Sequence, residues 1–196
     1  HRASMKYYFD YLKKNKFNCK YIDFDKKFDI KEYHMFDNVD KIKLSGKNTL
    51  VETPNFLLTK EIYEEYRKKT DKFFFNSFYM WGKDKIDVLP GVKSQDKYNR
   101  STMPKGVKIP KVESNKSDKK YIDEAKKYVL KHFPSNYGNV DNFIFPISHS
   151  TAKKFLNSFI KNKLNNFGKY QDAVVKGQSY LFHSLLSTSL NTGLLN

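Results

Sequence analysis

The last part of the chain, residues 166–196, is the stretch in which side chains of different chemistry separate most clearly. Lysine is frequent elsewhere, yet no charged residue follows Lys176. Leucines recur here every fourth residue and small polar side chains every three or four, so a helix would carry one apolar line and one polar line. The apolar line is Leu186, Leu190 and Leu194, and the polar line is Ser184, Ser187, Thr188 and Asn191. We predict a closing helix whose uncharged polar side faces something other than bulk water.

The polar line has two interpretations. A helix that begins near His183 and Ser184 would offer free backbone N–H groups and the positive end of its dipole there, which suit a phosphate. In the alternative, the serines cap their own helix or bond back to it beside an ordinary core. The residue pattern alone leaves both interpretations open.

Motifs in the same stretch resemble a known family. The segments are YQDA (170–173), SYLFHSLLS (179–187) and LNTGLL (190–195). They resemble the start of the flavin-binding domain in the photolyase-related branch of the cryptochrome/photolyase family, which includes the iron–sulfur photolyases of prokaryotes. More distantly, HSLLSTSLNTGLL is similar to the segment of other photolyases that lies along the ribityl and phosphate groups of the flavin.

The resemblance implies FAD as the cofactor and indicates which residues would contact it. They are His183, Ser184, Leu185 and Ser187, with Asn191 on the same polar line and Tyr170 as the tyrosine against the flavin phosphate. The spacing around Tyr170 departs from the family pattern, and Phe167, which fits the spacing better, has no hydroxyl. His183 would position the cofactor and not transfer protons. The sequence has no Ser-His-Asp or Cys-His spacing, so we assign no catalytic residue and no metal ligand.

Charge and cysteine content narrow the class of protein. The 37 basic and 21 acidic residues leave a net charge of +16, which favours a polyanionic partner such as DNA. An AT-rich genome also enriches lysine, and composition alone does not separate the two explanations. Cys19 is the only cysteine, which excludes a disulfide within the chain and a cysteine-ligated zinc or iron–sulfur site built from this chain alone. The 4Fe–4S cluster and the antenna pigment that the resemblance implies would need residues outside this chain.

No stretch of the sequence is long and apolar enough to cross a membrane, and the N-terminus lacks a signal-peptide profile. We therefore expect an intracellular protein, cytoplasmic or nucleoid-associated, that makes no membrane contact and is a monomer at full length. The first residue is not Met, and the last residues stop in a finishing helix. These features predict that the sequence is an internal fragment.

The predicted fold class is α/β followed by α. The resemblance implies an incomplete Rossmann-like α/β domain of the antenna type at residues 1–81, without its first strand. Residues 82–120 are rich in Gly, Pro, Ser, Lys and Asp and predict an interdomain linker. Residues 121–196 would then be the first helices of an all-α FAD-binding domain that is truncated here.

The local pattern of the first region begins with a helix at residues 2–16 and a strand at 19–24, half of an α/β repeat. The inward side of that helix is predicted to be Met5, Tyr8, Phe9 and Leu12. Further predicted elements are a short helix at 29–36, strands at 39–44 and 49–51, and a helix that is capped by Thr59 and ends at Lys69. Residues 73–81 read as a strand or a buried helix, and their rings as core or as a base-stacking surface.

The later region carries further predictions. Asp96, Asn99, Arg100 and Pro104 match half of a family pattern, and Arg100 would pair with a carboxylate or a DNA phosphate. A helix is predicted at 122–132, and Ser148 or Ser150 would cap the next one. Gly168 would close that helix in a left-handed conformation. Its apolar side is predicted to be Phe155, Leu156, Phe159, Ile160 and Leu164.

The resemblance implies a light-driven DNA repair flavoprotein, in which excited reduced FAD gives an electron to a pyrimidine lesion and recovers it. Two alternatives stay open: a cryptochrome-like blue-light sensor, and an inactive basic nucleic-acid-binding remnant of a split gene. Because most of the flavin pocket would lie beyond this fragment, we predict that the chain alone is inactive and does not bind FAD tightly.

Overall fold

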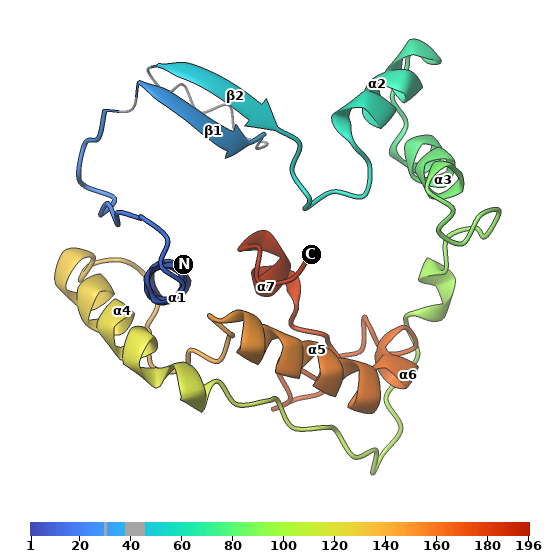
Figure 1. The fold of residues 1–196 in the computed structure, drawn as a ribbon. Helices are drawn as coiled ribbons and strands as arrows, with labels where there is room; N and C mark the ends of the chain where they lie inside the picture. The colour runs from blue at the N-terminus through green and yellow to red at the C-terminus, as the bar shows by residue number, and fades with distance from the viewer. Residues whose placement is uncertain (30, 38–45) are drawn as a thin grey trace. The chain divides into compact units, whose positions relative to one another are not determined.

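The structure is a computed structural model that describes residues 1–29, 31–37 and 46–196 (Figure 1). The predicted strand at 39–44 lies outside the described residues. The described elements are the helices α1 (Arg2–Lys14), α2 (Lys60–Lys68), α3 (Phe75–Lys85), α4 (Lys119–His132), α5 (His149–Asn162), α6 (Leu164–Phe167) and α7 (Ser187–Asn191), the strands β1 (Glu32–Phe36) and β2 (Lys47–Val51), and 3-10 turns at Asp96–Tyr98 and Lys116–Asp118. They form two compact units: unit 1 is His1–Tyr21 with Gln95–Asn196, and unit 2 is Ile22–Ser94.

Unit 2 contains a two-stranded parallel sheet. Strand β1 pairs with β2 from Glu32 beside Lys47 to Phe36 beside Val51. The helix predicted at 29–36 is therefore wrong. The side chains of β1 alternate between exposed and half-buried, with Tyr33 half-buried, and this period of two is the strand pattern. The predicted strand at 49–51 is confirmed, and parallel strands followed by helices agree with the coarse class of α/β followed by α.

The helices of unit 2 meet at a cluster of aromatic rings. Helix α2 begins at the predicted cap, where the Thr59 hydroxyl accepts a hydrogen bond from the Ile62 N–H at 3.2 Å. Tyr66 is buried, and its ring packs against the rings of Phe78 and Trp81 of α3, with centroids 5.1 Å away in each case. Residues 75–81 are therefore helical. Phe78 and Trp81 are half-buried against Tyr66, whereas Phe73, Phe74, Phe75 and Tyr79 are exposed, so the core interpretation holds for part of the rings only.

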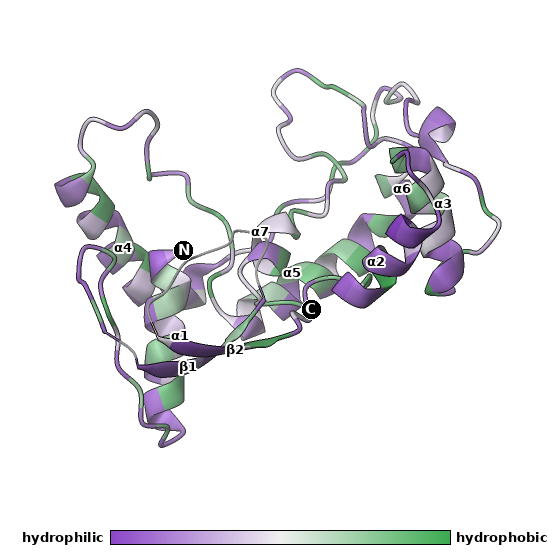
Figure 2. Ribbon diagram, turned by 90° about the horizontal axis from the view of Figure 1, so that it is seen from above, coloured by the Kyte–Doolittle hydropathy of each residue, from purple (hydrophilic) through white to green (hydrophobic). Residues whose placement is uncertain are grey.

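In unit 1, helix α1 packs against α4. Ala3 of α1 and Ile122 of α4 lie in one buried cluster with Ile147. The guanidinium of Arg2 donates to the Glu124 carboxylate at 2.7 Å. Arg2 also contacts Tyr128: its guanidinium carbon lies 3.6 Å from the centre of the Tyr128 ring. Figure 2 shows both hydrophobic and hydrophilic positions along α4 and α5, as helices with one buried side require.

The predicted inward side of α1 is wrong in part. Met5 and Tyr8 are exposed, whereas Ala3 is buried and Tyr7 packs edge-on against Tyr121. The side that packs is therefore the one with the small residue Ala3, which lets α4 approach closely. Phe9 and Leu12 are half-buried.

The strand predicted at 19–24 is also wrong. These residues form no strand, because Tyr21 packs on α1. Its ring lies edge-on to the Phe9 ring, with 5.8 Å between centroids, and the Lys6 ammonium sits 3.6 Å from the Tyr21 ring centre. Side-chain packing on a helix has replaced the backbone pairing that a β-prone sequence predicts.

Helix α5 begins in a buried polar network. Ser148 caps the helix: its hydroxyl accepts from the Thr151 N–H at 3.3 Å. The hydroxyls of Ser148 and Thr151 both donate to the carboxylate of Asp118, which is 4% exposed. The prediction of Ser148 or Ser150 as the cap is thereby resolved in favour of Ser148. The network fixes the start of α5 against the end of the preceding linker.

The end of α5 differs from the prediction. Gly168 has φ −59°, an ordinary right-handed value, so the predicted left-handed closure at this glycine is wrong. The helix instead ends at Asn162, and the short helix α6 follows. On the predicted apolar side Phe155 is buried, but Ile160 and Leu164 are exposed.

Candidate functional site

The closing helix begins later than its sequence pattern predicts. Helix α7 has five residues and starts at Ser187, so the predicted helical turn at His183 and Ser184 is wrong. The cause is backbone geometry: Leu181 and Leu185 have φ values of 35° and 58°, in the left-handed region that side chains with a Cβ rarely adopt. Residues 180–186 therefore form a loop that turns before α7.

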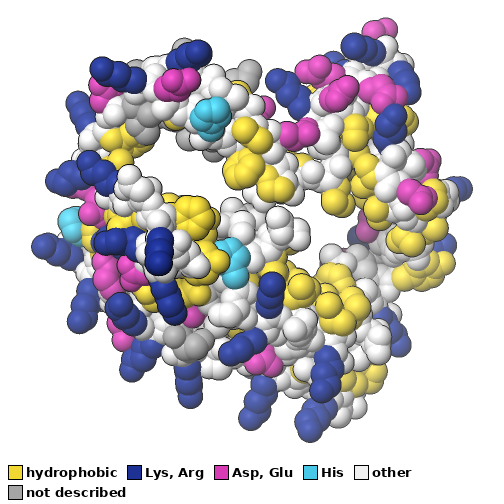
Figure 3. Space-filling view, viewed as in Figure 1, with side chains coloured by type: hydrophobic (Ala, Val, Ile, Leu, Met, Phe, Trp, Pro, Cys, Tyr) yellow, Lys and Arg dark blue, Asp and Glu magenta, His cyan; other side chains and the backbone are white. Residues whose placement is uncertain are grey.

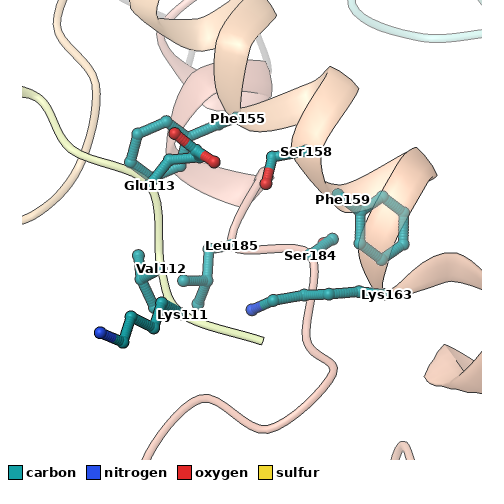
Figure 4. A pocket seen from close by; sticks show the side chains of 9 residues that line it. All are labelled: Lys111, Val112, Glu113, Phe155, Ser158, Phe159, Lys163, Ser184 and Leu185. Atoms are coloured by element: carbon teal, nitrogen blue, oxygen red, sulfur yellow. The ribbon is translucent and has the colours of Figure 1, made fainter. Parts of the chain in front are cut away.

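Part of this loop lines a small cavity beside α5 (Figure 4). Its volume is about 10 Å³, enough for one water-sized group. The walls are Ser184 and Leu185 from the loop, Phe155, Ser158, Phe159 and Lys163 from the α5 side, and Lys111, Val112 and Glu113 from the segment before α4. The structure thus brings two of the predicted cofactor contacts, Ser184 and Leu185, to one cavity.

Lys163 is the unexpected member of this cavity wall. The residue is 5% exposed, and its ammonium donates to the His183 carbonyl at 3.3 Å. Burial lowers the pKa of this ammonium below its ordinary value. Within the described ranges, Lys163 makes no ion pair with a carboxylate.

The spacing of Lys163 in the sequence indicates its burial. Phe155, Phe159 and Lys163 follow one another at intervals of four, so the lysine continues the apolar line of α5. A lysine on the buried side of a helix has to be paired or desolvated, and either outcome is a reason to look for a site. Ser158 and Lys111 carried no comparable signal.

The other predicted contacts lie away from this cavity. Ser187 and Asn191 are exposed. The His183 N–H donates to the Tyr180 carbonyl at 2.9 Å, which holds the loop in its turn. Tyr170 is buried, and its ring stacks on Phe182 with 5.8 Å between centroids. The roles of these residues toward a flavin stay predictions.

A larger cavity lies beside the small one, along the segment before α4. It has a volume of about 300 Å³ and lies between residues 109–112 and residues 177–181. Both cavities have Lys111 and Val112 in their walls. The two cavities therefore lie next to each other along this segment.

The chemistry of the small cavity suits one end of FAD. Hydroxyl and ammonium donors are the groups that bind phosphate oxygens, and the cavity offers Ser158, Ser184 and Lys163. In α7, the hydroxyls of Thr188 and Ser189 are buried and have no hydrogen-bond partner among the described residues. The cavity is too small for a flavin ring. The residues present therefore fit a single phosphate oxygen and not a complete flavin pocket.

The part of the chain that the structure describes holds neither a cluster of metal ligands nor a membrane-spanning helix. No three His, Cys, Asp or Glu side chains come together there as metal ligands. None of the helices in those residues has the length and apolar character to cross a membrane. Of the two partners predicted for Arg100, the structure shows the carboxylate: Arg100 Nε lies 3.4 Å from an Asp172 oxygen.

Comparison with known proteins identifies the family. Residues 27–145 match the family model described as deoxyribodipyrimidine photo-lyase-related protein. The chain is 38% identical over 89 residues to a (6-4) photolyase of Agrobacterium fabrum, a match that covers 45% of this chain and 17% of that protein. It is 30% identical over 140 residues to the uncharacterized protein R852 of Acanthamoeba polyphaga mimivirus, covering 55% of this chain and 71% of the relative. The chain belongs to the deoxyribodipyrimidine photo-lyase-related family.

Proposed function

We propose that this chain is part of a photolyase-like flavoprotein that uses light and reduced FAD to repair ultraviolet-induced pyrimidine lesions in DNA. The observation that carries the proposal is the match to the (6-4) photolyase, at 38% identity over 89 residues. The family match over residues 27–145 supports it. Because the matched stretch covers 17% of that photolyase, the activity is proposed for the longer protein.

The chain's own residues would bind and orient the cofactor. Reduced FAD would supply the light-excited electron. Ser184 and Leu185 line a cavity with phosphate-binding donors, and they would hold the phosphate end. His183 would fix this loop through its backbone, since its N–H and its carbonyl are both hydrogen-bonded. Lysine and arginine side chains, which are distributed over both units (Figure 3), would bind the DNA backbone.

The test compares the 196-residue chain with a longer product of the same gene. We expect the longer product to purify with flavin absorbance and to restore a lesion-containing oligonucleotide only under blue light. The 196-residue chain should retain no flavin, because it aligns with only 17% of the (6-4) photolyase. A flavin-free longer product, or light-independent repair, would contradict the proposal.

A second candidate is a basic nucleic-acid-binding protein without light chemistry. The net charge of +16 favours it. Fluorescence anisotropy separates the candidates. A photolyase-like protein should bind lesion-containing duplex more tightly than intact duplex, whereas a purely basic binder should bind both equally and with the same steep salt dependence.

A further inference from the structure

We propose that Lys163 is the cation of a phosphate-binding site that is completed by the hydroxyls of Ser158 and Ser184. The ligand class is a phosphorylated compound whose phosphate enters between α5 and the loop before α7. The identity of that compound as FAD rests on the proposed function. The assignment of Lys163 and Ser158 rests on their geometry.

The first step is the position of the charge. A buried ammonium is costly unless an anion or several hydrogen bonds compensate it. Lys163 is 5% exposed, and its hydrogen bond in the described part of the chain goes to a neutral carbonyl, that of His183 at 3.3 Å. Glu113 also borders the cavity, but it makes no ion pair with Lys163, and its carboxylate lies beside Phe155 in Figure 4. A ligand anion would supply the missing negative charge.

The second step is the state of the two hydroxyls. Ser158 Oγ accepts a hydrogen bond from the Asn162 side-chain amide at 3.2 Å. Ser184 Oγ accepts one from the Leu186 N–H at 3.4 Å. Because each oxygen already accepts, each hydroxyl proton can be donated to a ligand oxygen. Two hydroxyl donors and an ammonium donor border one small cavity, and such donors bind the oxygens of a phosphate.

The third step is space. The small cavity holds one water-sized group, so a single phosphate oxygen would enter it and the rest of the phosphate would stay at its mouth. The larger cavity of about 300 Å³ starts along the same wall, at Lys111 and Val112. The remainder of the ligand would lie there, between residues 109–112 and 177–181, with the Lys111 ammonium as a second cation.

The rival explanation is that Lys163 only ties the loop to the end of α5 through the His183 carbonyl. The two explanations differ in what Lys163→Met does. A structural tether predicts a less stable protein and no effect specific to phosphate. A phosphate-binding lysine predicts loss of phosphate binding, with the ligand-free protein as stable as before or more stable, because a buried charge is removed.

The experiment measures thermal unfolding of the 196-residue chain against pyrophosphate concentration, at constant ionic strength set with chloride. The matched control is Lys161→Met, which removes an exposed lysine two residues earlier, at the end of α5, and the same unit of charge. We expect a saturable rise in Tm for the wild type and for Lys161→Met. For Lys163→Met we expect pyrophosphate to bind at least about tenfold more weakly, and for Ser158→Ala about fivefold more weakly.

Equal responses from all variants, or no saturable response in the wild type, would overturn the proposal. If Lys163→Met fails to fold, as judged by circular dichroism, Ser158→Ala decides the question. Flavin content of the longer gene product separates this inference from the proposed function. A flavin-free product with Lys163-dependent pyrophosphate binding leaves the site standing and removes the flavoprotein assignment. A longer product whose flavin content is unchanged by Lys163→Met removes the Lys163 site and leaves the flavoprotein assignment standing.

Discussion

The two units of this chain are stabilised by different kinds of contact. In unit 1, the start of α5 depends on directional hydrogen bonds to one buried carboxylate, that of Asp118. In unit 2, α2 and α3 depend on ring packing around Tyr66. Both units expose large apolar side chains, such as Leu57 at 76% in unit 2 and Val174 at 93% in unit 1. We therefore expect the loss of a buried polar group to destabilise unit 1 and the loss of a buried ring to destabilise unit 2.

The largest effect is expected from Tyr66→Ala. This change removes a buried ring from a cluster that contains Phe78 and Trp81, and it should lower the free energy of unfolding of unit 2 by about 4 kcal/mol. Trp81 is the only tryptophan in the chain, so its fluorescence follows this unit directly. Tyr66→Phe keeps the ring and is the control. Equal losses for the two variants would mean that the ring is not the stabilising group.

Asp118→Ala comes next, and it tests the polar side of the comparison. The hydroxyls of Ser148 and Thr151 would lose a charged acceptor inside the protein, at a cost of about 3 kcal/mol. Hydrogen exchange of the amides in the first turn of α5 should accelerate. Asp123→Ala, which removes an exposed carboxylate from α4, should change neither measurement. Unchanged exchange in Asp118→Ala would show that packing alone fixes the start of α5.

A smaller effect is expected at the contact of α1 with α4. Arg2→Lys keeps the charge but loses the planar group that lies over Tyr128 and binds the Glu124 carboxylate with both Nε and Nη2. We expect urea unfolding to show a loss of about 1 kcal/mol. Lys6→Arg, at the neighbouring contact with Tyr21, is the matched control and should be close to neutral. A loss as large for Lys6→Arg would point to a general effect of the lysine–arginine exchange.

The smallest effect concerns acid stability in unit 2. Hydrogen bonds from Lys85 and Lys69 lower the pKa of Glu65 from 4.5 to about 2. A lowered folded pKa means that the contribution of Glu65 is present above about pH 4.5 and is lost as the pH falls toward about 2. We follow thermal unfolding by Trp81 fluorescence. As the pH falls between these values, the Tm of the wild type should decrease more than the Tm of Glu65→Gln. Parallel pH profiles for the two proteins would contradict this.

Local chemistry predicted the helix starts well, because a cap is decided by a few neighbouring residues. Thr59 and Ser148 cap α2 and α5 as their positions indicate, and Arg100 finds a carboxylate. The misses arise where distant residues decide. The β-prone segment around Tyr21 packs on α1, and residues 32–36 find a parallel partner 15 residues later in β2. Neither partner is visible in a window of local sequence.

The candidate site shows the same division. The resemblance led to Ser184 and Leu185, and the structure places both in one cavity wall. It did not lead to Lys163, because that residue lies between α5 and α6 and meets the loop only in the folded chain. The positive φ of Leu185 was equally beyond local prediction, since leucine adopts that conformation only when its surroundings impose it.

The discontinuity of unit 1 has a consequence for synthesis of the protein. Helix α1 leaves the ribosome well before α4, because its contact Glu124 lies 122 residues later. At about 5–20 residues per second, α1 would wait roughly 6 to 24 seconds for α4. Unit 2 is one continuous segment and is completed within that interval. Unit 2 would therefore be complete before unit 1, and α1 would be exposed to chaperones and proteases until α4 is translated.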